Sequence, residues 1–209
     1  MKSILCFGDS NTWGYNAQTG QRFSYHERWT GVMGMALGDG FLVIEEGLNG
    51  RTTVWDDPVE NVKSGLSYLP TCLKSHRPVD LVILMLGTND IKARFSQSPY
   101  DIAAGVSNLV QVILASQCGV GDDAPEILLV VPPPVDPGEF FYDMFKGARE
   151  KSFELPKYYA RVAEEFRCSL LDCGMILSVD PLDGIHLDVE GHRTLGQAFG
   201  DKVVSILGA

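Results

Sequence analysis

The chain has 209 residues, of which 45% are hydrophobic and 21% charged, so it has enough apolar content to bury a core and is not intrinsically disordered. Asp and Glu number 27 against 17 Lys and Arg, which gives a formal net charge of −10. Nucleic acids and anionic membrane surfaces would be repelled by such a chain. We therefore expect one globular domain spanning residues 1–209, with neither a nucleic-acid nor a membrane partner.

The cysteines and the N-terminal residues indicate the cellular compartment of the protein. We identify neither a CxxC pair nor a histidine at metal-ligand spacing among the cysteines, and their odd number suits a reducing environment. We interpret all of them as structural thiols: Cys6, Cys72, Cys118, Cys168 and Cys173. The apolar run Ile4–Phe7 after Lys2 is too brief for a secretory signal. These features predict a cytoplasmic protein.

Short apolar runs alternate with segments of helical periodicity. The runs predict five β-strands: Ser3–Phe7, Phe41–Glu45, Leu81–Leu86, Ile127–Val131 and Ser169–Leu171. The other segments predict five helices: Trp29–Leu37, Gly65–Ser75, Ile102–Ser116, Pro156–Phe166 and Val189–Leu207. Strands that alternate with helices indicate a parallel sheet covered on both faces. Leu81–Leu86 is apolar without alternation, which is typical of a central strand.

Two later segments need a specific interpretation. The stretch from Ile102 to Gly121 has no charge and could span a bilayer, but polar residues interrupt it, so we interpret it as a buried helix. The proline-rich segment Pro132–Gly138 must be a loop, because proline has no amide donor for a sheet. The aromatic segment Glu139–Phe145 then lines a substrate entrance, makes a subunit contact, or forms an irregular flap over the core.

The candidate chemistry follows the strands. Ligands of an open parallel sheet bind beyond the carboxyl ends of its strands, where the chain changes direction. Four polar segments occupy such places in this sequence: Gly8–Thr12, Gly47–Gly50, Gly87–Asp90 and Asp183–His186. We expect these four segments to converge at one edge of the sheet.

Ser10 is the candidate nucleophile in the first segment. A serine hydroxyl is a weak nucleophile at neutral pH and needs a base to remove its proton. A turn from strand to helix would expose the Ser10 hydroxyl and place its backbone amide at a helix start, where negative charge is favoured. The sequence leaves open the alternative that Ser10 only caps the helix that follows.

Asp183 and His186 are the candidate orienting carboxylate and base. At a spacing of three residues the carboxylate can reach Nδ1 of the imidazole, which leaves Nε2 to accept a proton. The alternative is a surface histidine beside an acidic residue at a helix start. The remaining histidines lack a comparable context at the end of a strand: His26, His76 and His192.

Three groups are candidate donors to an oxyanion. They are the backbone amides of Ser10 and Gly50 and the side-chain amide of Asn89, although Gly50 could be a simple turn glycine and Asn89 a loop residue. Asp9 and Asp90 adjoin these donors and offer carboxylates. We expect no metal there, because no HxxxH, HxD or DxD pairing accompanies them. Asp9 is expected to hold the turn through backbone hydrogen bonds.

These blocks, in this order and approximate spacing, resemble the SGNH (GDSL-type) hydrolases. The runs Ile4–Ser10, Glu45–Thr53 and Met85–Asp90 are similar to the bacterial arylesterase and acyltransferase branch of that family, and the resemblance covers nearly the whole chain. It implies a three-layer α/β/α sandwich of flavodoxin-like type with a five-stranded parallel sheet. It also implies a serine esterase that needs no cofactor, with Ser10, Asp183 and His186 as its triad.

The resemblance implies hydrolysis of small aryl or short-chain esters through an acyl-enzyme, with water, an alcohol or peroxide as acceptor. A carbohydrate O-deacetylase with the same triad is an alternative within the hydrolases. A non-catalytic ligand-binding module on a doubly wound sheet is the alternative from another class, although the glycine-rich phosphate-binding motifs of such modules do not occur here.

Three residues are candidates for the lining of the substrate pocket. Asn11 stands where the common family motif has leucine, so it could place an amide near the acyl group. Trp13 and Val54 are further candidates for the pocket wall. The apolar loops at Val54–Trp55 and Phe140–Phe145 could also form subunit contacts. The resemblance implies the same, because members of this branch often form homo-oligomers, so we expect a homo-oligomer of unknown size.

Overall fold

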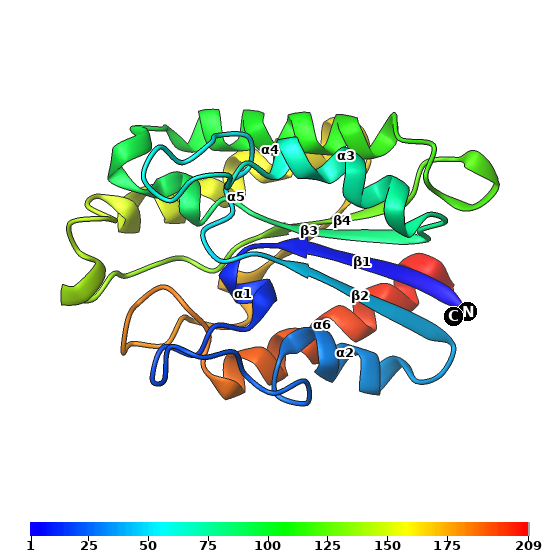
Figure 1. The fold of residues 1–209 in the computed structure, drawn as a ribbon, viewed down its shortest axis with the longest axis horizontal. Helices are drawn as coiled ribbons and strands as arrows, with labels where there is room; N and C mark the ends of the chain where they lie inside the picture. The colour runs from blue at the N-terminus through cyan, green and yellow to red at the C-terminus, as the bar shows by residue number, and fades with distance from the viewer. Residues whose placement is uncertain (209) are drawn as a thin grey trace.

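Figure 1 shows a parallel sheet between two layers of helices in the computed structural model, which describes residues 1–208. The strands are β1 (Lys2–Gly8), β2 (Phe41–Gly47), β3 (Leu81–Met85), β4 (Glu126–Val131) and β5 (Ser169–Asp172). They pair in the order β2-β1-β3-β4-β5, and all neighbours are parallel. This is the flavodoxin-like order of a doubly wound sheet, and β3 lies at its centre. The predicted three-layer α/β/α fold is confirmed.

The longer helices divide between the two faces of the sheet (Figure 1). Helices α2 (Trp29–Leu37) and α6 (Val189–Leu207) cover one face, and α3 (Gly65–His76), α4 (Pro99–Leu114) and α5 (Ala148–Phe166) cover the other. Side chains of a strand alternate between the faces. Leu5 and Phe7 of β1 therefore pack in the core beneath α3, α4 and α5, while Ile4 and Cys6 pack with Trp29 of α2.

Two helices differ from the prediction at their N-termini. Helix α4 begins at Pro99 rather than Ile102, because Ser98 and Asp101 form a reciprocal capping box there. Helix α5 begins at Ala148, two turns before the predicted start at Pro156, and the proline lies in its interior. The first turns of α5 stay helical because buried side chains such as Ser152 and Leu155 pack on the core, which outweighs the missing amide donor of Pro156.

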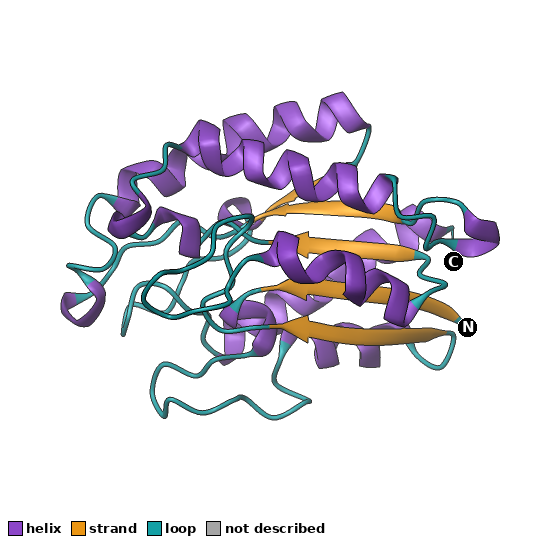
Figure 2. Cartoon of the chain, turned by 45° about the horizontal axis from the view of Figure 1, so that its top comes forward, coloured by secondary structure: helices purple, strands orange, loops and turns teal. Residues whose placement is uncertain are grey.

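The apolar residues of the charge-free stretch from Ile102 form the buried face of α4, as expected, but the helix ends at Leu114, two residues before the predicted end at Ser116. Within residues 1–208, no helix combines the length and the apolar character that crossing a bilayer requires. Figure 2 shows the strand arrowheads pointing to the side of the molecule where the long loops gather. The candidate segments at the strand ends therefore meet on that side.

Candidate active site

The turn after β1 presents Ser10 at the carboxyl edge of the sheet. Helix α1 (Ser10–Trp13) is a single turn, and its N-cap is Asp9, whose Oδ1 accepts the backbone N–H of Asn11 at 3.0 Å. The turn is tight: a Cβ on Gly8 would lie 2.0 Å from Oγ1 of Thr12. The capping role considered for Ser10 thus belongs to Asp9, which leaves the serine hydroxyl for other contacts.

A chain of two hydrogen bonds joins Ser10, His186 and Asp183. Nε2 of His186 lies 2.9 Å from Oγ of Ser10, and Nδ1 lies 2.6 Å from Oδ2 of Asp183. All three residues are buried, so water competes little for these bonds. In this arrangement the carboxylate fixes the tautomer with a proton on Nδ1, and Nε2 is left to accept the serine proton.

Asp183 is held in its charged form. Burial by itself raises the pKa of this carboxyl, but hydrogen bonds from the His186 ring and from the backbone amides of Ile185 and His186 outweigh it and keep the pKa below its usual value. The same two amides fix the direction of Oδ1, at 2.8 and 2.9 Å. The turn therefore supplies a carboxylate whose orientation and charge are both set locally.

The proline-rich loop fixes the turn that carries Asp183. Pro132–Gly138 has no regular structure, as predicted, and its backbone runs beside that turn. The N–H of Asp136 donates to the carbonyl of Gly184 at 2.9 Å, and the N–H of Gly138 donates to the carbonyl of Asp183 at 3.0 Å. Gly184 has φ +71°, and a Cβ there would lie 1.8 Å from the Asp136 carbonyl oxygen. Only glycine fits between these two backbones.

The three candidate oxyanion donors border the same cleft. Ser10, Gly50 and Asn89 line a cavity of about 180 Å³ together with His186. Asn89 is oriented by its Nδ2, which donates to the carbonyl of Arg51 at 3.2 Å. Gly50 has φ +81°, and a Cβ there would lie 2.5 Å from Oε2 of Glu60. The fold therefore brings the first three strand-end segments and the His186 turn to one point, as the sequence predicts.

Arg51 ties two of these segments together. Its Nη1 donates to the carbonyl of Gly8 at 2.9 Å and also to the carbonyl of Glu46, while its guanidinium stacks 4.2 Å from the centre of the Phe7 ring. Arg51 is buried, and its carbonyl is the acceptor that orients Asn89. A single side chain thus connects the end of β1 with the loop after β2.

Aromatic and apolar side chains form the other walls of the cleft. The Tyr15 ring lies 4.4 Å from the His186 ring, and the Phe141 ring lies 6.3 Å from it on the short helical turn Glu139–Phe141. Phe141, Met144 and Phe145 all line the cavity, and Phe145 is also buried in the core. Two of the three interpretations of the aromatic segment Glu139–Phe145 therefore agree with the structure: it lines the cleft, and it packs over the core.

The three predicted pocket residues lie outside the lining of this cleft. Trp13 stacks against Arg22, whose guanidinium is 5.3 Å from the indole ring. Val54 packs toward α4, where its Cγ2 would lie 3.3 Å from a Cβ on Gly105. Both residues are close in sequence to Ser10 or Gly50, but the turns between them direct the two side chains away from the cleft. The third residue, Asn11, has a different function.

Asn11 clamps the segment that carries the imidazole. Its Oδ1 accepts the backbone N–H of Leu187 at 3.0 Å, and its Nδ2 donates to the carbonyl of Ile185 at 3.3 Å. These two backbone groups flank His186 on either side. The amide that replaces the usual leucine therefore links the Ser10 turn directly to the His186 turn, which a leucine side chain could not do.

A charged pair that no sequence pattern predicted also lines the cleft. Lys92 and Glu60 line the cavity, with 2.7 Å between Nζ and Oε1, and Nη2 of Arg94 donates to the same Oε1 at 2.8 Å. Lys92 is only 3% exposed. Lys92 follows the Gly87–Asp90 segment by two residues, which is a usable signal, whereas nothing local marks Glu60.

The two further carboxylates serve the turns and not the cleft. Asp90 accepts the N–H of Thr53 at 3.0 Å and its hydroxyl at 2.5 Å, and burial raises its pKa to about 6. Burial likewise raises the pKa of Asp9 to about 6. Neither residue lines the cavity. The geometry agrees with the expected role of Asp9 in holding the turn.

A buried serine hydroxyl that contacts an imidazole oriented by a carboxylate, at the carboxyl edge of a doubly wound sheet, defines the class of α/β serine hydrolases. The model of the GDSL-like lipase/acylhydrolase family matches residues 6–194. The chain belongs to this family, which confirms the resemblance, and it is a carboxylic ester hydrolase.

Solved structures of similar proteins share the fold over their whole length. The inhibitor-bound aryl esterase of M. Smegmatis is 46% identical, with 98% of this chain and 99% of that chain covered and a TM-score of 0.93. Est24, a carbohydrate acetylesterase from Sinorhizobium meliloti, is 45% identical, with coverages of 99% and 100% and a TM-score of 0.94. A carbohydrate acetylesterase family member from the same organism is 38% identical, covers both chains fully and has a TM-score of 0.95.

No curated protein sequence gives a significant match. The family and the structural neighbours nevertheless favour an enzyme over the non-catalytic ligand-binding module that the sequence left open.

Proposed function

We propose that Ser10, His186 and Asp183 are the catalytic triad of a serine esterase that hydrolyses small carboxylic esters through an acyl-enzyme. One observation carries the proposal: the His186 ring contacts the Ser10 hydroxyl with one nitrogen and the Asp183 carboxylate with the other. In acylation, Nε2 of His186 takes the proton as Oγ of Ser10 attacks the ester carbonyl. The same proton then passes to the departing alcohol.

The oxyanion of the tetrahedral intermediate is proposed to lie between the amides of Ser10 and Gly50 and Nδ2 of Asn89. Each such donor contributes about 3 kcal/mol to stabilising the transition state in enzymes of this kind. Water activated by His186 then attacks the acyl-enzyme and releases the acid. An alcohol or peroxide in the same position would accept the acyl group instead, so we extend the proposal to acyl transfer.

The cleft supports small acyl and aryl groups. Its volume is about 180 Å³, and the rings of Tyr15 and Phe141 with the side chains of Met144 and Phe145 give an apolar surface beside the nucleophile. The M. Smegmatis neighbour, which is named an aryl esterase, is in accord with this choice.

The test is Ser10→Ala assayed with p-nitrophenyl acetate, with Ser205→Ala on the exposed face of α6 as the matched control. We expect the first variant to lose nearly all turnover and the control to keep it. A fluorophosphonate probe should form one adduct, and peptide mass spectrometry should locate it on Ser10. Wild-type turnover in Ser10→Ala, or an adduct on another residue, would refute the assignment.

A carbohydrate acetylesterase is the second candidate. Two similar structures carry that description, and the pair Lys92 and Glu60 in the lining of the cleft offers charged partners for sugar hydroxyls. Comparison of kcat/KM for an acetylated sugar and for an aryl acetate distinguishes the two. A higher value for the sugar that falls in Lys92→Met, while aryl turnover persists, would establish the second candidate.

We further propose that the chain forms a homo-oligomer and acts in the cytoplasm. Phe140 is 88% exposed and lies next to Phe141 of the cleft, and Tyr142 and Leu182 are also exposed apolar side chains. Light scattering coupled to gel filtration tests the assembly, and a monomeric mass would refute it. The five free thiols suit a reducing compartment, which cell fractionation tests.

A further inference from the structure

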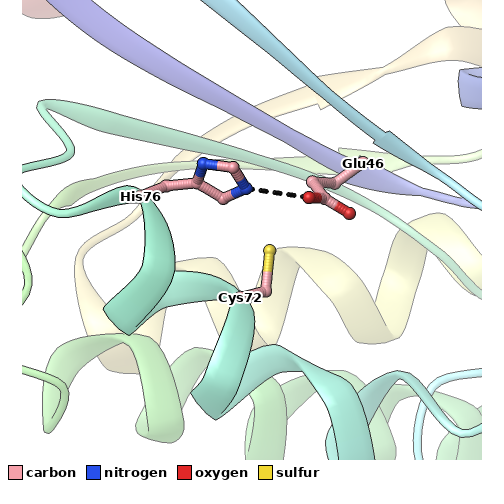
Figure 3. A group of neighbouring side chains, drawn as sticks. All are labelled: Glu46, Cys72 and His76. Carbon is pink, nitrogen blue, oxygen red and sulfur yellow. Dashed lines mark hydrogen bonds and ion pairs between the residues drawn. The ribbon is translucent and has the colours of Figure 1, made fainter.

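A second cluster of reactive side chains lies between β2 and α3, outside the residues that line the cleft. Figure 3 shows Glu46 from the end of β2 facing Cys72 and His76 on α3. One ligand atom from each of the three residues lies within 4.8 Å of the others, and Nε2 of His76 is 2.8 Å from Oε1 of Glu46. Cys72 and His76 are four residues apart, so they lie on one face of the helix.

We propose that Glu46, Cys72 and His76 form a binding site for Zn²⁺ or another divalent cation of the same borderline class. Thiolate, imidazole and carboxylate are the three ligand types that zinc binds in proteins. Around a tetrahedral zinc ion, the separations between such ligand atoms are roughly 3.3–3.5 Å. Nε2 of His76 and Oε1 of Glu46 are closer than this, at 2.8 Å, and the ligand atom of Cys72 lies within 4.8 Å of both, so side-chain adjustments bring the three atoms around one ion.

The burial of the three ligands suits an ion that keeps one open position. Cys72 is 1% exposed, while the side chains of His76 and Glu46 are 30% and 18% exposed. A metal can therefore enter from solvent on the side of His76, and the thiol lies at the inner end of the site. Water would complete the coordination sphere from the same side.

The charges near the cluster are compatible with a bound cation. Arg51 is a basic group beside the cluster, but its guanidinium stacks on the Phe7 ring and donates to the carbonyls of Gly8 and Glu46. Binding forms a metal–sulfur bond and breaks the S–H bond of Cys72, and the proton passes to water. The thiolate and the carboxylate then neutralise the two charges of the ion, which leaves Arg51 facing a neutral site.

The ion would connect β2 to α3 directly. Glu46 belongs to the strand and the other two ligands belong to the helix. The bound metal would therefore cross-link the edge strand of the sheet to the helix that packs on it. Because a metal that binds the folded state stabilises it, the melting temperature should rise with zinc. The inference is independent of Ser10, since none of the three ligands lines the cleft.

The full chain, treated with chelator and then freed of it, should be titrated with Co²⁺ as a spectroscopic probe and with Zn²⁺ as competitor. We expect one equivalent of cobalt to give intense visible bands of a four-coordinate site and a near-ultraviolet sulfur-to-metal charge-transfer band, both abolished by zinc. Cys72→Ser should lose the charge-transfer band. His76→Gln should weaken zinc binding by more than the roughly 10–100-fold that loss of an outer-shell partner costs.

Matched controls are Cys168→Ser and His26→Gln, which alter a cysteine and a histidine elsewhere and should bind as the wild type does. The rise in melting temperature with zinc should occur in the wild type and both controls but not in Cys72→Ser or His76→Gln. His76 is partly exposed, so its variant keeps the test valid if the buried serine variant unfolds. Absence of a charge-transfer band in the wild type, or its persistence in Cys72→Ser, would overturn the proposal.

Discussion

Gly184→Ala tests whether the proline-rich loop sets the position of the triad turn. Gly184 lies between Asp183 and His186 in a left-handed conformation with φ +71°. A Cβ at this position would lie 1.8 Å from the carbonyl oxygen of Asp136 and 2.5 Å from its carbon, and both are backbone atoms. The added methyl group must therefore push the two backbone segments apart.

The expected loss in the free energy of unfolding has three contributions. Placing alanine in the left-handed region costs about 1–2 kcal/mol wherever it occurs. The clash adds about 1–3 kcal/mol of overpacking, and stretching the bond from the Asp136 N–H to the Gly184 carbonyl costs about 1 kcal/mol more. We expect Gly184→Ala to lower the free energy of unfolding by about 4 kcal/mol, which leaves a domain of ordinary stability folded.

Gly121→Ala is the matched control. Gly121 also has φ +71°, but a Cβ there would meet no atom within 4 Å. The strain of the left-handed conformation is therefore common to both variants, and the difference between them isolates the contact with Asp136. Urea unfolding should show a gap of about 3 kcal/mol between the two variants.

The same contact should affect catalysis. If the turn moves by about 1 Å, the imidazole moves relative to Ser10, and kcat for p-nitrophenyl acetate should fall by about 100-fold. Gly121→Ala should keep the wild-type rate. Equal stability and equal turnover in the two variants would show that the loop does not position the triad.

Three further predictions rest on single contacts. Asp183→Asn should lower kcat by about 10⁴-fold, because the amide no longer holds the tautomer that leaves a proton acceptor facing the serine; a loss below tenfold in an ester assay would contradict this. Burial lowers the pKa of His192 to about 4 from 6.5, so its contribution to stability is complete above pH 6.5 and is lost as pH falls toward 4. That contribution is about 3 kcal/mol. The free energy of unfolding, measured with urea, should therefore fall less steeply at acid pH in His192→Gln than in the wild type. The same pH dependence in both proteins would refute this prediction. Tyr159→Phe should cost about 1–3 kcal/mol in thermal unfolding, because the hydroxyl donates to the carbonyl of Leu86 at 2.6 Å in the core; an unchanged melting temperature would show that water replaces that bond.

Local patterns in the sequence are sufficient to predict the layers of the fold. An apolar run such as Leu81–Leu86 can be buried on both faces only inside a covered sheet, and polar turns at strand ends meet at one edge whatever the details of packing. For this reason the sequence pattern is sufficient to predict that Ser10, Gly50 and Asn89 lie near the turn at Asp183. Their grouping follows from topology, which short-range patterns specify.

The walls of the cleft depend on contacts between loops that are distant in sequence. Trp13 and Val54 are close to Ser10 and Gly50 along the chain, but their side chains pack against Arg22 and toward α4. The groups that do line the cleft, such as Phe141, Lys92 and Glu60, lie in connections whose course no local pattern fixes.

The cluster of Glu46, Cys72 and His76 also depends on tertiary packing that local sequence does not specify. Cys72 and His76 are four residues apart, but this spacing brings two ligands together only on a helix whose exposed and buried faces are known, so the sequence alone did not indicate a metal site. Glu46 comes from a different element and reaches them through the packing of α3 on the sheet. Periodicity and strand ends are local properties that a chain displays in its sequence, whereas the approach of side chains from separate elements is settled only when the layers pack together.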